Sequence, residues 1–193
     1  MTKWLSHRMV ERGIIKEEEQ ELYQFGIRNG MILLLNVVTA LVIGLLTEQL
    51  AVVAVFTLSF MVLRSYTGGY HSDSRIFCYL GSNLVLLVPV YTQAVFYKTS
   101  LAWLLAVLLV SAGIIFLLSP MHSKNRKLDK EEQKHFGRKA RLIAALELAV
   151  LGILWHAGQI PYAYAVYTGI CITALFMLIG KAQLWIQSHT ENR

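Results

Sequence analysis

A histidine and a cysteine seven positions apart are the residues of this sequence best suited to covalent chemistry. They are His71 and Cys78, in the stretch RSYTGGYHSDSRIFC that covers residues 64 to 78. A thiolate is a strong nucleophile, and an imidazole can accept the thiol proton and later return it to a leaving amine. In one straight helix the two residues would lie about 10 Å apart, so they meet only if the chain turns between them.

Helix-capping residues between the two predict such a turn. Asp73 and Ser74 are typical N-cap residues, so a helix is expected to begin there, with Cys78 in its first turn. The positive end of the helix dipole and a nearby imidazole both favour the thiolate form at that position. His71 would lie on the preceding loop and fold back onto the thiol.

The other residues of the stretch have two interpretations each. Gly68 and Gly69 allow unusual backbone conformations and close approach of a substrate chain. Arg64 could bind a carboxylate, or it could brace the loop by binding carbonyl groups at a helix end. Asp73 could orient the imidazole or only cap the helix. A lone Cys near a lone His is often inert, and two ligands do not make a zinc site, so the residues predict no metal or other cofactor.

The elements that must position these residues are membrane spans. Of the 193 residues, 55% are hydrophobic and only 16% are charged, which is typical of a membrane protein. We predict an all-α, polytopic membrane protein with six spans, forming one domain over residues 1–193. The apolar runs are Met31–Leu46, Leu50–Leu63, Tyr79–Phe96, Leu101–Leu118, Leu142–Trp155 and Tyr162–Ile179. The second and fifth are shorter than the roughly 17 to 25 residues that a span needs.

The distribution of basic residues predicts the orientation. Segments 1–30, 64–78, 119–141 and 181–193 hold 17 of the 18 Lys and Arg residues, and only Lys98 falls on the other side. The positive-inside rule therefore places both termini and the stretch 64–78 in the cytoplasm, in a protein of the cell membrane. Two cysteines do not suggest a disulfide framework.

The first 30 residues lack the order of a cleavable signal peptide. Trp4, Leu5, Met9, Ile14 and Ile15 are spaced roughly as one helix face. This suits an amphipathic segment in the membrane interface, although a solvated helix packing on the rest of the protein fits equally well.

The stretch 64–78 resembles the signature of the accessory gene regulator B (AgrB) family of quorum-sensing membrane peptidases. Arg64, Gly68, Gly69, His71 and Cys78 all have the spacing of that signature. Length, span number, N-terminal segment and basic internal loop are similar as well. In one departure, Arg28 stands where the family often has an acidic or amide residue, in YQFGIRNG.

The resemblance implies a cysteine endopeptidase acting on a short AgrD-like precursor peptide. Cys78 would attack a peptide carbonyl, release the C-terminal tail and hold the rest as a thioester. A cysteine or serine of the peptide would then close a thiolactone or lactone ring, giving an autoinducing peptide. His71 would act first as base and then as acid.

The basic loop 119–141 has two interpretations. It carries eight basic and three acidic residues, a net charge of +5, which would attract an acidic precursor tail or anionic lipid headgroups. It could equally be charge that only sets the topology. Lys124, Arg126 and Lys127 are the candidate substrate-binding residues.

Two other function classes are compatible with six spans. A small carrier for a peptide or an ion could use Glu147, an ionisable residue inside a predicted span, although snorkelling or pairing with Arg141 would also explain it. A noncatalytic scaffold or sensor would not need the cysteine and histidine. No nucleic-acid partner is expected, and a homodimer suits so small a bundle without being derivable from the residues.

Overall fold

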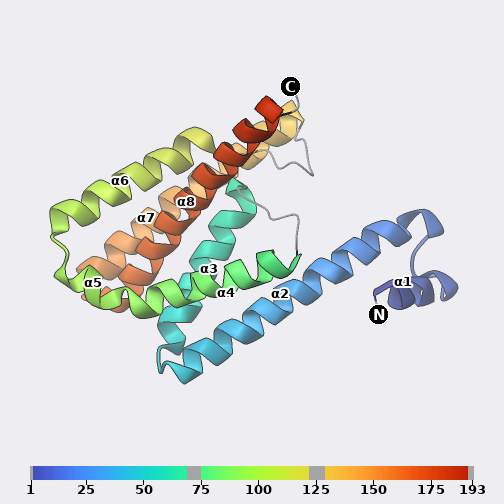
Figure 1. The fold of residues 1–193 in the computed structure, drawn as a ribbon, viewed down its shortest axis with the longest axis horizontal. Coiled ribbons are helices and arrows are strands. Elements are labelled where there is room, and N and C mark those ends of the chain that lie inside the picture. Colours follow the sequence, from blue (N-terminus) through green and yellow to red (C-terminus); the bar gives the residue numbers. More distant parts are fainter. Residues whose placement is uncertain (1, 69–74, 122–128, 191–193) are drawn as a thin grey trace. The chain divides into compact units, whose positions relative to one another are not determined.

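Every regular element in the described part of the chain is a helix, as expected. A computed structural model describes residues 2–68, 75–121 and 129–190. In chain order the elements are α1 (Thr2–Glu11), a 3-10 helix (Glu17–Glu19), α2 (Gln20–Leu46), α3 (Leu50–Thr67), α4 (Arg75–Tyr91), α5 (Gln93–Lys98), α6 (Leu101–Leu118), α7 (Lys130–His156) and α8 (Ile160–Thr190), shown in Figure 1. The predicted all-α class is confirmed.

The chain divides into two compact units, residues 1–39 and 40–193. The first unit contains α1, the 3-10 helix and most of α2. In α1 the guanidinium of Arg8 lies 5.0 Å from the centre of the Trp4 ring. Trp4, Leu5 and Ile14 are exposed, whereas Ile15 is buried. Exposed apolar side chains on a short helix suit the interfacial interpretation of this segment, which stays a prediction.

The second unit is a helical bundle in which α8 packs against α3, α6 and α7 (Figure 1). One core cluster includes Val53, Phe56 and Ala165. A second includes Leu63 and Met177, both fully buried. Because α8 packs against α3, α6 and α7, it is the most buried of the four candidate membrane helices.

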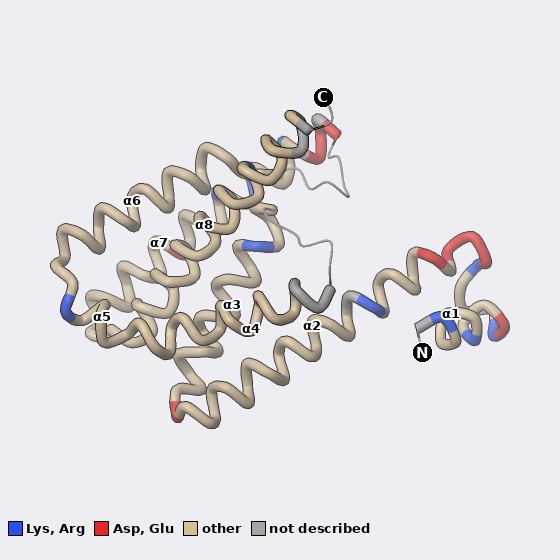
Figure 2. The backbone as a smooth tube through the Cα atoms, in the orientation of Figure 1, with Lys and Arg blue, Asp and Glu red and all other residues tan. Residues whose placement is uncertain are grey.

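Four helices of the described residues are long and apolar enough to cross a membrane. They cover residues Glu17–Leu46, Leu50–Thr67, Leu101–Leu118 and Ile160–Ile186. The second of the predicted spans therefore reaches 18 residues, because α3 continues through Arg64 to Thr67. Charged residues of the described chain lie mainly towards the helix ends and connections in Figure 2. This distribution suits an integral membrane protein.

The other two predicted spans have a different form. Tyr79–Phe96 is divided between α4 and α5, because α4 ends at Tyr91, two residues after Pro89. Proline lacks the backbone N–H that would bond to the carbonyl four residues earlier, but the N–H of Thr92 still donates to the carbonyl of Val88 at 3.0 Å. The two helices are separated at Thr92. Leu142–Trp155 is the second half of α7, whose first half begins in the predicted loop 119–141. Residues 130–141 are thus helical, which corrects the loop prediction for that part.

Glu147 has a partner other than the one suggested by the sequence. The hydroxyl of Ser59, on α3, donates a hydrogen bond of 2.7 Å to the Glu147 carboxylate on α7. Arg141 instead donates through Nε to the carbonyl of Phe116, at 3.1 Å. On the α8 side, a Cβ added to Gly169 would lie 2.5 Å from the Ser59 hydroxyl. Ser59 and Glu147 therefore link three helices of the bundle.

Candidate functional site

The end of α3 leads directly into the stretch that carries the predicted chemistry. Arg64 lies in the last turn of α3 and donates through Nη1 to the carbonyl of Gly68, the residue that ends the helix. Its guanidinium also lies 5.3 Å from the centre of the Phe176 ring. Of the two sequence interpretations of Arg64, the contacts support bracing of the helix end by a carbonyl bond.

Gly68 has a backbone conformation and surroundings that require glycine. Its φ is +71°, a value that residues with a Cβ rarely adopt. A Cβ at this position would lie 2.5 Å from the carbonyl oxygen of Met121. Beside it, the N–H of Met121 donates to the carbonyl of Thr67 at 2.8 Å. The start of the signature stretch is therefore held against the chain that follows α6.

Residues 119–121 also contact the first half of α7. Gly137 is buried, and a Cβ there would lie 3.0 Å from Cδ of Pro120 and 3.4 Å from the carbonyl oxygen of Ser119. We call the group Thr67, Gly68, Pro120, Met121 and Gly137 the junction. It brings together the end of α3, the end of α6 and the first half of α7.

Aromatic contacts reinforce the junction from the α7 side. The rings of Tyr66 and Phe136 have centres 6.4 Å apart, and Nζ of Lys139 lies 5.9 Å from the Tyr66 ring. At its start α7 is capped, because the Asp129 carboxylate accepts from the N–H of Glu131 at 2.9 Å. The capping box keeps the first half of α7 helical despite its many charges.

Sequence reasoning missed the junction residues other than Gly68. A signal was present for Gly137, a glycine inside the otherwise helix-favouring run KEEQKHFGRKAR, because such a glycine usually has a packing reason. Pro120 and Met121 carried no comparable signal. Met121 contacts Thr67, 54 positions away in the sequence, and Pro120 contacts Gly137, 17 positions away.

The two segments outside the described residues both leave from the junction. Residues 69–74 follow Gly68, and residues 122–128 follow Met121. Gly69, His71 and Asp73 lie in the first segment, whereas Lys124, Arg126 and Lys127 lie in the second. All six are therefore outside the described part of the chain. Their predicted roles stay predictions.

The helix that carries Cys78 begins where the capping residues placed it. α4 starts at Arg75, so Cys78 is the fourth residue of that helix and lies in its first turn. Only the backbone of Cys78 is described. The first turn of a helix provides unpaired N–H groups and the positive end of the dipole, which favour a thiolate there.

The basic residues of the first half of α7 extend from the same junction. Lys134, Arg138 and Lys139 are exposed. They give the surface next to the junction a positive charge that can attract an acidic peptide or anionic headgroups. The arrangement therefore places a basic surface close to the start of the signature stretch.

Sequence comparison with known proteins identifies a family for this chain. Residues 1–179 match the family model described as accessory gene regulator B. The chain is 26% identical over 156 residues to the accessory gene regulator protein B of Staphylococcus intermedius, covering 79% of this chain and 80% of the relative. It is 23% identical over 148 residues to an AgrB-like protein of Clostridium perfringens, covering 74% of this chain and 69% of the relative. No solved structure matches the chain.

Proposed function

Because the chain belongs to the accessory gene regulator B family, we propose that it is a membrane cysteine endopeptidase that cleaves and cyclises an AgrD-like precursor, with His71 and Cys78 as its catalytic dyad. The family is a peptidase family of quorum sensing, and membership implies a role in processing an AgrD peptide. The observation that carries the proposal beyond family membership is the junction, since it ties the start of the signature stretch to the basic half of α7.

In the proposed topology the protein crosses the membrane six times. Four helices have the necessary length and composition, and α4 with the second half of α7 would supply the other two crossings. Both termini, the segment 64–78 and the segment 119–141 would lie in the cytoplasm, as the distribution of Lys and Arg favours. The junction would then lie at the cytoplasmic surface of the bilayer.

In the first chemical step the Cys78 thiolate attacks a carbonyl carbon of the precursor. The C–N bond breaks, and the leaving amine takes the proton that His71 removed from the thiol. The products are a thioester on Cys78 and the free C-terminal tail. Since a thioester replaces an amide, this step is uphill, and removal of the tail must draw it forward.

In the second step a thiol or hydroxyl of the bound peptide attacks the thioester. A new thioester or ester bond closes the ring, the bond to Cys78 breaks, and the thiol is restored. Exchange of one thioester for another is nearly isoenergetic. The enzyme therefore has to hold the peptide nucleophile near the carbonyl and exclude water.

The carrier alternative depends on Glu147, and its contacts favour a structural role. A carboxylate that serves transport has to reach a path through the protein, whereas Glu147 is hydrogen-bonded to Ser59 between α3 and α7. A polar pair inside a membrane bundle commonly joins helices. We therefore assign the pair to helix association in the bundle.

The proposal is tested by expressing the wild-type chain in membranes together with a candidate acid-tailed precursor that contains an internal cysteine. A peptidase converts the precursor into a free tail and a cyclic product, both identified by mass spectrometry. A carrier would leave the precursor intact on one side or the other of the membrane, and a scaffold would leave it unprocessed. An intact precursor, transported or not, contradicts the proposal when the peptide is known to be the precursor of this protein.

Gly68→Ala tests whether the junction positions the catalytic segment. The new Cβ would lie 2.5 Å from the Met121 carbonyl oxygen, so the start of the segment has to move. We expect precursor cleavage to fall by about 100-fold, the order of effect that a misplacement of roughly 1 Å can produce. The measurement is cleavage per amount of membrane-inserted protein.

Gly158→Ala is the matched control for this change. Gly158 has the same φ of +71°, but an added Cβ there would meet nothing within 4 Å. It therefore tests the effect of a positive φ alone, about 1 kcal/mol in the left-handed region, without the contact with Met121, whereas Gly68 also has a ψ of −154° that only glycine adopts readily. Equal activity of the two variants would show that the junction does not align the catalytic segment.

A further inference from the structure

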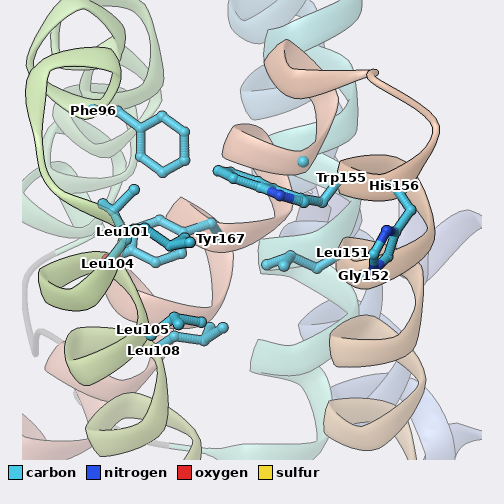
Figure 3. A pocket seen from close by; sticks show the side chains of 11 residues that line it. Phe96, Leu101, Leu104, Leu105, Leu108, Leu151, Gly152, Trp155, His156 and Tyr167 are labelled. Atoms are coloured by element: carbon cyan, nitrogen blue, oxygen red, sulfur yellow. The ribbon is translucent and has the colours of Figure 1, made fainter.

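An apolar cavity lies in the bundle at the end opposite the junction. It has a volume of about 260 Å³ and opens to the outside of the protein. Figure 3 shows side chains that line it. It lies among α5, α6, α7 and α8. Its lining residues are Phe96, Leu101, Leu104, Leu105, Leu108, Leu151, Gly152, Trp155, His156, Ala163 and Tyr167. The proposed peptidase reaction uses none of them.

The walls of the cavity are almost entirely hydrocarbon. Leucines of α6 form one side, and aromatic rings close the end near the α7–α8 turn, where Trp155 and Phe96 have ring centres 6.3 Å apart. The rings of Phe96 and Tyr167 are 5.3 Å apart. Such a cavity does not hold water well and binds apolar ligands.

Gly152 keeps part of this space open. It lies on α7 among the lining residues, and a Cβ added there would meet nothing within 4 Å. A larger residue at this position would extend into unoccupied space. Gly152 therefore contributes to the open space beside α7.

Polar groups near the mouth match one class of occupant. His156 lines the cavity at the last residue of α7, and Lys98 ends α5 two residues after the lining residue Phe96. Lys98 is exposed. Lys98 thus stands in the chain between two lining residues, Phe96 and Leu101, and its ammonium together with the imidazole of His156 would match a phosphate attached to a hydrocarbon chain. From Leu101 to Leu108 the α6 wall rises by about 10 Å, enough to follow part of an acyl chain.

We propose that this cavity binds one acyl chain of a phospholipid, with the headgroup phosphate at Lys98 and His156. The chain would come from the leaflet on the side of the bundle away from the junction, where Trp155 lies at the end of α7, as tryptophans of the membrane interface commonly do. This lipid would fill the gap between α6 and α7 in the bilayer. The site is independent of the peptidase reaction.

The experiment uses the full chain in nanodiscs of phosphatidylglycerol with brominated acyl chains. Trp4, Trp103 and Trp185 are replaced by Phe, so that Trp155 alone reports fluorescence. A bound brominated chain quenches Trp155, and we expect Gly152→Leu to lose most of this quenching because its side chain fills the cavity. Gly152→Ala should lose less. Circular dichroism checks that each variant remains helical.

Gly113→Leu is the matched control. Gly113 is also a helical glycine whose added Cβ would meet nothing within 4 Å, but it does not line the cavity. It should retain the quenching of the unsubstituted protein. Equal quenching in the folded Gly152→Leu and Gly113→Leu variants overturns the proposal. So does a loss of Trp155 quenching when precursor peptide is added, because it would identify the peptide as the occupant.

The headgroup contact is tested by native mass spectrometry after mild extraction. Lys98→Gln should lose the retained phosphatidylglycerol more readily than Lys181→Gln, an exposed lysine near the other end of α8. Loss that is equal for the two variants contradicts the assigned headgroup position. In the Cys78→Ala variant, Trp155 should be quenched and phosphatidylglycerol retained to the same extent as in the wild type. The lipid result therefore does not depend on the outcome of the peptidase experiment.

Discussion

Replacement of Cys78 by alanine is expected to abolish precursor cleavage while leaving the protein in the membrane. Alanine has no nucleophile, so neither the acyl-enzyme nor the cyclic product can form. Removal of a catalytic nucleophile costs on the order of 10⁶-fold in turnover. Cleavage in membranes, measured by mass spectrometry of the released tail, should fall below detection. Cys78→Ser, with a weaker nucleophile, should be nearly as inactive.

Cys171→Ala is the control for this experiment. Cys171 is the other cysteine of the chain and lies half-buried in α8. The Cys171→Ala variant should cleave the precursor at the wild-type rate. Cleavage by Cys78→Ala at the wild-type rate would show that Cys78 is not the nucleophile. The scaffold interpretation of this protein would then be favoured.

His71→Gln is expected to lower cleavage by about 10² to 10⁴-fold, the usual contribution of a general acid–base. Glutamine can still form hydrogen bonds, but it cannot exchange a proton. The same change removes a positive charge that would stabilise the thiolate of Cys78. Alkylation of Cys78 by iodoacetamide should therefore accelerate at a higher pH in His71→Gln than in the protein that retains His71. Both proteins carry Cys171→Ala, so that only Cys78 is alkylated.

His135→Gln provides the matched control. His135 is exposed on the first half of α7, where its ring lies against Phe136 with centres 5.9 Å apart. It should change neither cleavage nor the pH profile of alkylation. An unchanged alkylation profile in His71→Gln would mean that imidazole and thiol do not interact, and the dyad would have to be abandoned.

Much of the helical framework was predictable, because it follows from local properties of the chain. The run Leu101–Leu118 became α6 with the same bounds, and the capping residues located the start of α4 to within one or two positions. Where the predicted helix bounds were wrong, local residues outweighed the pattern of apolar and charged residues. The predicted third span is interrupted at Thr92, between α4 and α5, and the capping box at Asp129 made the second half of the predicted basic loop helical.

Partners between distant segments were not predictable in the same way. Snorkelling or pairing with the nearby Arg141 was the sequence explanation for Glu147, but its carboxylate accepts a hydrogen bond from Ser59, 88 positions away. The hydrogen bond from the N–H of Met121 to the carbonyl of Thr67 likewise links two segments. No sequence pattern at their ends indicates that they meet. Such contacts depend on how whole helices pack, and any residue on the facing side could have been the partner.

By itself the sequence determined the membrane class, the helices and the candidate chemistry at His71 and Cys78, since apolar length, charge asymmetry and motif spacing are properties of short segments. Only the tertiary structure decided that Gly68 rests on Met121, that Gly137 lies against Pro120, and that Gly152 leaves a cavity open. These features arise where side chains of separate helices meet. The free energy of such a contact depends on shapes that no single segment contains.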